Sequence, residues 1–301
     1  MIGTGRRLAA LILLALTGLP QASGASLEEA GAVQSGYAQV VADPPVRSKA
    51  PEVAALINET VPRVAAVVGA TDLQPIAVYL HADRRSMLEG TGVPLESEVV
   101  GLTSFRSGTI QLDGSERLAK LTKVVPHEVA HVLVARLLGP QALPALPLWV
   151  SEGISEYAAG TEASQVDPIW VRALSEGESL RVAELDEAIA AHGDGAGLAY
   201  AEAASLVRFL VAKRGEGVIS ELLRSLRLTH DFGAALRETA GWSVDELEEA
   251  WRGETIRQWR WPLLFESQAV WFGLMVLLFL AGLARYLRER RRRQESAEED
   301  W

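Results

Sequence analysis

The sequence predicts an α+β protein: a small N-terminal mixed sheet with helices, then a mainly helical half, then one transmembrane helix near the C-terminus. Short runs rich in β-branched residues lie in the first part of the chain. Apolar residues spaced three and four apart dominate the second part. With 301 residues, 49% of them hydrophobic, the chain is long enough to bury a sizeable core.

The first part is expected to form four strands and one helix. Turn residues bound the β-branched runs, of which IAVYL is an example. The helix between the first two strands is indicated by apolar positions at helical spacing. The expected strands are residues 37–41, 76–80, 99–105 and 109–112, and the expected helix is residues 50–68.

The second part is expected to be helical. Leu206, Phe209 and Leu210 form one apolar stripe, and Gly215 is a plausible C-cap after it. No repeat or low-complexity tract interrupts this region, so we expect one domain over residues 35–258. The expected helices are residues 116–138, 148–158, 199–214, 218–226 and 244–259.

The first 25 residues are predicted to be a secretory signal peptide. Two arginines precede an apolar run at residues 8–16, and small residues follow as far as Gly24 and Ala25, near which we expect cleavage. The alternative is a short N-terminal anchor that is retained. The apolar run is short for a segment that must cross the hydrocarbon layer.

Residues 269–287 are predicted to be a transmembrane helix. Residues 269–284 contain no charge, and the full stretch of 19 residues spans about 28 Å at 1.5 Å per residue, close to the hydrocarbon thickness. Trp259 and Trp261 precede this stretch and Tyr286 lies at its end, in the positions that amphipathic rings prefer.

A run of arginines follows, at Arg288 and residues 290–293, and argues against a buried core helix. It is typical of a positive-inside signal, which predicts a cytoplasmic tail at residues 288–301 and a cell-membrane protein with its domain outside. The alternative is a nucleic-acid-binding patch. The net charge of −10, and the 21 basic against 34 acidic residues within residues 26–268, argue against any nucleic acid partner.

A metal-binding motif lies within the expected helix 116–138. The chain contains no Cys, so a metal would be held by His and carboxylate groups. His127 and His131 belong to an HExxH sequence, and side chains four apart lie on one helical face about 6 Å apart, so that both imidazoles can reach one cation. Glu128 lies on the flank, where it can meet a metal-bound water.

A third ligand is expected downstream, at Glu152 in the sequence WVSEGISEY. The Gly- and Pro-containing stretch LGPQALPALP allows the chain to turn, so that the next helix packs on the first. Two His and one Glu form a catalytic zinc arrangement. Glu156 follows one turn later and can accept the outer N–H of a ligating His. The alternative for Glu152 is a solvated acid at a helix start.

These residues resemble the gluzincin zinc metallopeptidases of the thermolysin-like clan, and more closely the peptidase MA-like domain of bacterial exported proteins. The order HEVAH, LPLWVSEGISEYAAG, AYAEAASLVRFL and DELEEAWR is similar to that family. The resemblance implies that His127, His131 and Glu152 bind zinc and that Glu128 is the general base and proton shuttle. It also implies a substrate peptide along an edge strand, taken here as residues 109–112.

Three residues are candidates for stabilising the oxyanion. Tyr200 is the first candidate, because the family places an aromatic hydroxyl near the site, and Tyr157 and His192 are alternatives. Pro126 departs from a regular helix, and we expect a kink or a new helix start at about Val125.

The functional hypothesis is a membrane-anchored, extracytoplasmic, zinc-dependent peptidase that acts on peptides or proteins. Its chemistry would use a zinc-activated water, with Glu128 as general base. The alternative is a binding or assembly protein of the cell envelope on an inactive metallopeptidase scaffold. An intramembrane protease is disfavoured, because the helix of the motif contains Glu116, Arg117, Lys120 and Lys123.

Overall fold

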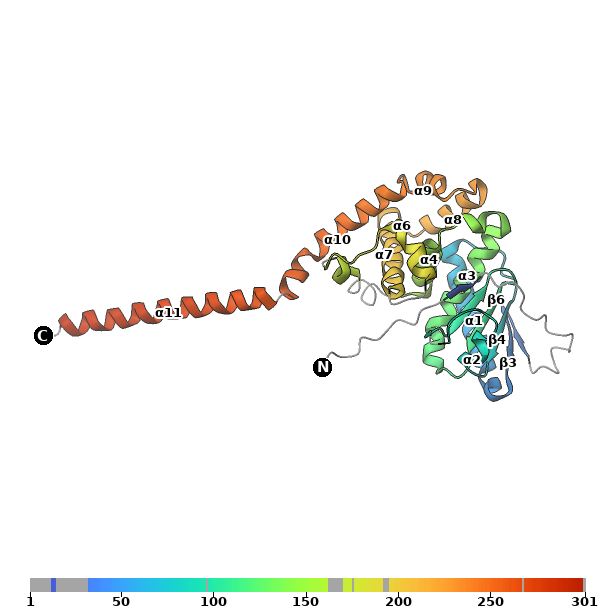
Figure 1. Ribbon diagram of the computed structural model, residues 1–301, viewed down its shortest axis with the longest axis horizontal. Coiled ribbons are helices and arrows are strands. Elements are labelled where there is room, and N and C mark those ends of the chain that lie inside the picture. The colour runs from blue at the N-terminus through green and yellow to red at the C-terminus, as the bar shows by residue number, and fades with distance from the viewer. Residues whose placement is uncertain are drawn as a thin grey trace. The chain divides into compact units, whose positions relative to one another are not determined.

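The computed structural model describes residues 12–14, 32–95, 97–161, 170–174, 176–191, 195–266 and 268–299 (Figure 1). Contacts divide the chain into two compact units, residues 1–249 and residues 250–301. The first unit contains the sheet and most of the helices. The mixture of a small N-terminal sheet and a largely helical remainder confirms the predicted α+β class.

Six strands form one mixed sheet, in the order β1-β5-β6-β4-β3-β2. The pairs β3–β4, β4–β6 and β1–β5 are parallel, whereas β2–β3 and β5–β6 are antiparallel. Alternate side chains of β3 and β4 are buried, as expected of strands with one face in the core. The strands are β1 (Ile12–Leu14), β2 (Val33–Ser35), β3 (Ala38–Ala42), β4 (Ile76–His81), β5 (Gly101–Ser104) and β6 (Thr109–Asp113).

The expected edge strand, residues 109–112, is not an edge strand. These residues form β6, which pairs with β4 on one side and with β5 on the other. Four of the five residues of β6 are buried, as is typical of an interior strand. β5 lies next to the end of the sheet, and Ile12–Leu14 pair along its outer side. Apolar patterning indicated that these strands exist, but it does not determine their order.

Helices of the first unit cover the sheet and one another, with α1 against β3 and α3 against β5 (Figure 1). Helices α2, α6 and α9 were not predicted, because each has nine residues or fewer and is shorter than the 11 to 18 residues over which helical periodicity is recognised. The helices are α1 (Ala50–Val68), α2 (Arg84–Leu88), α3 (Leu118–Ala142), α4 (Leu148–Ala159), α6 (Val182–Ala190), α7 (Ala196–Arg214), α8 (Val218–Thr229), α9 (Phe232–Ala240) and the start of α10 (Val244–Glu266).

Helix α3 is continuous at the position where a kink or a new helix start was expected. Pro126 lies inside α3, and no new helix starts at Val125. The backbone leaves helical torsion angles instead at Gly139, with φ 68° and ψ 179°, immediately before Pro140. Pro126 costs one backbone hydrogen bond, which packing on all sides of this buried segment offsets, whereas Gly139 adopts positive φ without strain. The break therefore lies beyond both histidines.

Helices α4 and α7 approach each other closely at Gly153. A Cβ atom at Gly153 would lie 2.5 Å from the carbonyl oxygen of Ala203 and 2.6 Å from Cγ2 of Val207. Backbone atoms occupy this space, so the contact cannot be relieved by a rotamer change. The absence of a side chain here fixes the distance between the helix that contains Glu152 and the helix behind it.

We expect Gly153→Ala to destabilise the protein by about 1 to 3 kcal/mol, the usual cost of overpacking a core. The midpoint of thermal unfolding of the full-length protein should fall by about 2 to 4 °C per kcal/mol. Gly197→Ala is the matched control, because a Cβ atom at this position of α7 meets nothing within 4 Å. An unchanged midpoint in Gly153→Ala would contradict the close approach of the two helices.

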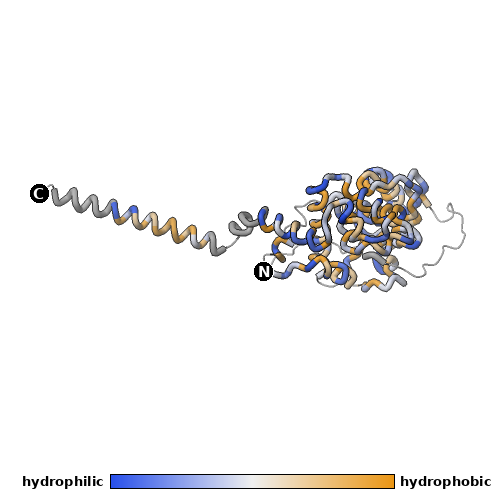
Figure 2. The backbone as a smooth tube through the Cα atoms, turned by 90° about the horizontal axis from the view of Figure 1, so that it is seen from above, coloured by the Kyte–Doolittle hydropathy of each residue, from blue (hydrophilic) through white to orange (hydrophobic). Residues whose placement is uncertain are grey.

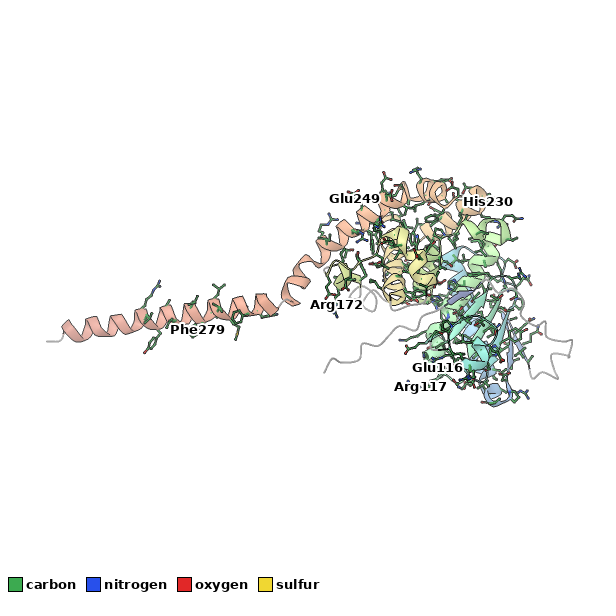
Figure 3. All side chains as sticks on the ribbon, viewed as in Figure 1. Glu116, Arg117, Arg172, His230, Glu249 and Phe279 are labelled. Atoms are coloured by element: carbon green, nitrogen blue, oxygen red, sulfur yellow. The ribbon has the colours of Figure 1, made fainter. Side chains whose placement is uncertain are left out.

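The second unit consists of the rest of α10 and of α11 (Gln268–Glu299). Residues Trp271–Arg288 of α11 have a mean hydropathy of 1.4, and by length and composition this helix could cross a membrane. Its large apolar side chains are exposed, with Phe279 70% accessible (Figure 3), and Figure 2 shows hydrophobic residues along this helix. A core helix would bury these groups. The expected span, residues 269–287, lies within α11.

Of the expected signal peptide, only Ile12–Leu14 are among the described residues, as β1. The remaining residues of that segment lie outside the described part of the chain. Signal cleavage thus stays a prediction.

Candidate active site

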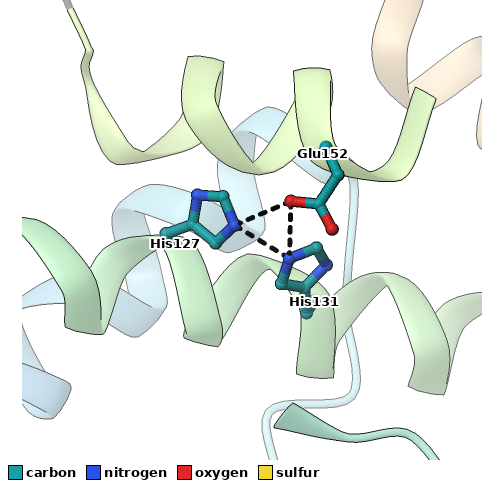
Figure 4. Close-up of side chains that lie close together, drawn as sticks. All are labelled: His127, His131 and Glu152. Atoms are coloured by element: carbon teal, nitrogen blue, oxygen red, sulfur yellow. Dashed lines mark hydrogen bonds and ion pairs between the residues drawn. The ribbon is translucent and has the colours of Figure 1, made fainter. Parts of the chain in front are cut away.

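Two helices bring the three expected ligands together. His127 and His131 lie one turn apart on α3, and α4 packs against α3 so that Glu152 faces both (Figure 4). The His127 Nε2 atom is 3.2 Å from Glu152 Oε2 and 2.9 Å from His131 Nε2, and His131 Nε2 is 3.5 Å from Glu152 Oε2. All three side chains are buried. They are the one such group of possible ligands among the residues that the structure describes.

The spacing of these atoms fits a tetrahedral zinc ion. Zinc ligands at 2.0 to 2.1 Å with tetrahedral angles lie about 3.3 to 3.4 Å from one another. The three observed distances, 2.9, 3.2 and 3.5 Å, bracket that value. The second oxygen of Glu152, Oε1, is buried and has no hydrogen-bond partner within the described part of the chain. The donor set and its geometry therefore fit zinc.

A second layer of polar groups holds the two imidazoles. Glu156 Oε1 lies 3.1 Å from His127 Nδ1, and Thr161 donates a hydrogen bond of 2.6 Å to Glu156 Oε2. Ser151 and Ser155 place their hydroxyl oxygens 3.2 and 3.1 Å from His131 Nδ1. Such contacts fix the orientation of a metal-binding imidazole.

Glu156 was predicted for this position, whereas Ser151, Ser155 and Thr161 were not. Ser151 and Ser155 are four residues apart and therefore share one face of α4, a spacing that is visible in the sequence. Thr161 lies beyond the C-terminal end of α4. No helical spacing relates it to Glu156.

Electrostatics within the site are dominated by burial and by close opposite charges. Burial alone would lower the pKa of His127, but Glu152 and Glu156 outweigh it and raise the pKa to about 10. Burial would raise the pKa of Glu152, but His131 and His127 lower it to about 2. Burial would likewise raise the pKa of Glu156, which its contact with His127 holds below the usual range. Glu152 and Glu156 are therefore ionised, and their negative charges favour a bound cation.

Glu128 contacts strand β5. Thr103 of β5 donates a hydrogen bond of 2.5 Å to Glu128 Oε2. The other oxygen, Oε1, is buried and has no hydrogen-bond partner among the described residues. Burial raises the pKa of Glu128, although the charges of His131 and His127 oppose the change. A carboxylate with one oxygen held and the other free, and with a raised pKa, suits a general base near neutral pH.

The candidates for oxyanion stabilisation are placed differently. Tyr200 on α7 is buried, and burial together with the charges of Glu152, Glu128 and Glu156 raises its pKa well above 10. Its phenol therefore lies near the three carboxylates and keeps its proton. Tyr157 is partly exposed, and burial and the charge of Glu216 raise its pKa. His192 lies outside the described residues.

The family model of the Peptidase MA superfamily matches residues 56–257 of the chain. The chain belongs to the peptidase MA superfamily. No curated protein matches it. The peptidase MA match covers both α3 and α4, and hence the whole His127, His131 and Glu152 cluster. Membership of the peptidase MA superfamily confirms the predicted resemblance. At the level of the family it supports a metallopeptidase-type scaffold whose substrate class is peptides or proteins.

Proposed function

We propose that this protein is a membrane-anchored, extracytoplasmic, zinc-dependent peptidase. The observation that supports it most directly is the buried cluster of His127, His131 and Glu152, whose charges act on the neighbouring carboxyl of Glu128. When bound, zinc would polarise the scissile carbonyl and lower the pKa of its water. His127, His131 and Glu152 would hold the ion, and Glu156 would orient His127.

The residues of the chain would divide the remaining work. Glu128 would take a proton from the attacking water on its free oxygen and return it to the amine that leaves. The un-ionised phenol of Tyr200 would donate a hydrogen bond to the developing oxyanion. Both groups are buried, so their interactions would be little weakened by solvent.

We propose that an extended substrate lies along β5. The predicted strand, β6, is paired on both sides and offers no free backbone groups. β5 pairs with β6 on one side only, and its outer side is the one along which Ile12–Leu14 lie. Because we also propose that residues 1–25 are removed as a signal peptide, that side would then be open for strand addition.

For the domain organisation we propose a signal peptide at residues 1–25, a peptidase domain at residues 35–258, a span at residues 269–287 and a cytoplasmic tail at residues 288–301. The exposed apolar helix Trp271–Arg288 supports the span. The arginines that follow it support an inside tail.

Protease added to intact cells or spheroplasts is expected to digest the domain and to spare an epitope at the C-terminus. Permeabilised cells are the control, in which the epitope should be lost as well. Protection of the domain together with loss of the epitope in intact spheroplasts would contradict the topology.

The function itself is tested by incubating the zinc-loaded, full-length protein with unfolded casein-like chains and with extracts of envelope proteins. Cleavage is the expected result. A zinc-loaded protein that cleaves nothing would favour a binding or assembly role on the same scaffold.

A further inference from the structure

We propose that strand β5 positions the general base: Thr103 holds one carboxylate oxygen of Glu128, and Gly101 leaves the space in which that side chain lies. This inference rests on the proposed peptidase function. It assigns roles to two residues of the sheet, neither of which is a metal ligand or belongs to the HExxH motif.

The hydroxyl of Thr103 is committed to Glu128. It lies 2.5 Å from Glu128 Oε2 and 3.2 Å from the backbone oxygen of Glu128. A threonine hydroxyl has one proton to donate, and the shorter distance assigns that proton to the carboxylate. Both side chains are about 99% buried, so water does not compete for the bond. Hydrogen bonds to a charged acceptor in such surroundings are among the stronger ones in proteins.

Gly101 lies two residues before Thr103, and side chains two apart on a strand project from the same face. A Cβ atom at Gly101 would lie 3.0 Å from Glu128 Oε1 and 3.1 Å from Glu128 Cγ. It would also lie 2.6 Å from Cγ1 of Val124, one turn before Glu128 on α3. A side chain at this position would therefore push against the side chains of Val124 and Glu128.

Together these contacts determine which oxygen of Glu128 is available. Oε2 is held by Thr103, and Oε1, beside the space left by Gly101, has no partner among the described residues. The backbone of β5 is itself fixed, because Thr103 is paired with Ile110 of β6. The sheet thus sets the rotamer of a side chain that belongs to the helix. A base held in one orientation reacts faster than one that samples several.

Thr103→Val tests the hydrogen bond, because valine keeps the β-branched shape and removes the hydroxyl. We expect kcat of the full-length, zinc-loaded protein to fall about 10- to 100-fold, while KM and zinc content stay unchanged. Thr103→Ser restores the donor and should recover most of kcat. A general loss of folding would lower zinc content as well, so the division between kcat and KM identifies a positioning role.

Thr91→Val is the matched control. Thr91 is also buried and donates a hydrogen bond of 2.7 Å, to the backbone oxygen of Leu88. The substitution removes the same group from a site that does not contact Glu128, so kcat should stay at the wild-type value. Gly101→Ala should also lower kcat, because the added methyl group displaces Glu128 even though the variant retains the hydroxyl of Thr103.

Crystal structures of wild type and Thr103→Val give a readout that needs no activity. We expect one conformer of Glu128 in the wild type, with Oε2 on Thr103, and a displaced or multiple conformer in the variant. An unchanged Glu128 conformer with unchanged kcat in Thr103→Val would overturn the proposal. If the wild type binds zinc and cleaves nothing, the peptidase function fails, and the Glu128 conformers alone decide whether β5 positions this side chain.

Discussion

Glu128→Gln is expected to keep stoichiometric zinc and to lose turnover by a factor of about 10² to 10⁴, the usual effect of removing a positioned general base. This corresponds to about 3 to 5 kcal/mol of activation free energy. Glutamine is nearly isosteric with glutamate and favours helix, so α3 and the three ligands should be undisturbed. Its amide cannot accept a proton at neutral pH. Turnover and zinc content are measured on the same full-length preparation.

Glu249→Gln is the control for this substitution. Glu249 is exposed on α10 (Figure 3), and replacing it makes the same chemical change away from the cluster. Cleavage by Glu128→Gln at the wild-type rate would remove Glu128 from the mechanism. A binding protein on the same scaffold would show no cleavage in either form and an unchanged affinity for its partner.

Removal of a metal ligand should have the other large effect. We expect one zinc per chain in the wild type. His127→Ala or His131→Ala should lower zinc affinity more than any substitution of the residues that contact these imidazoles, such as Glu156. Loss of an outer partner of a metal-binding His costs about 10- to 100-fold in affinity. Glu156→Gln should fall in that range, because it weakens the contact with His127 Nδ1 and leaves every ligand in place.

Zinc affinity is measured by competition with a chelator of known affinity, on full-length protein. His230→Asn is the control: His230 is an exposed imidazole that ends α8 with positive φ, which asparagine tolerates (Figure 3). Its zinc affinity should equal that of the wild type. Stoichiometric zinc in a variant that lacks both His127 and His131 would contradict the assignment.

Most residues at the candidate metal site could be predicted from the sequence, because they are related by helical spacing. His127 and His131 are four apart on one helix, and Glu152 and Glu156 are four apart on the next. A regular period of 3.6 residues converts such spacing into a shared face. Packing of the two helices on each other was indicated by the Gly- and Pro-containing link between them.

The contacts of Glu128 could not be predicted from helical spacing. Thr103 and Gly101 come from a strand about 25 residues earlier, and their contact with α3 depends on how the sheet packs on that helix. The order of the strands has the same origin. β6 lies in the interior because it pairs with β4 as well as with β5. Long-range packing, which local periodicity does not encode, decides both features.

All six residues of α4 from Ser151 to Glu156 are buried. Ser151 and Ser155 contact His131, Glu152 and Glu156 face the candidate metal site, and Gly153 lies against α7. Surface helices of most domains drift in sequence on their solvent side while their buried side stays fixed. This segment lacks a solvent side, so a substitution at almost any position would need a compensating change on another helix. We therefore expect this segment to evolve slowly, with substitutions accompanied by changes on the neighbouring helices. Redesign would have to replace the segment and its contacts together.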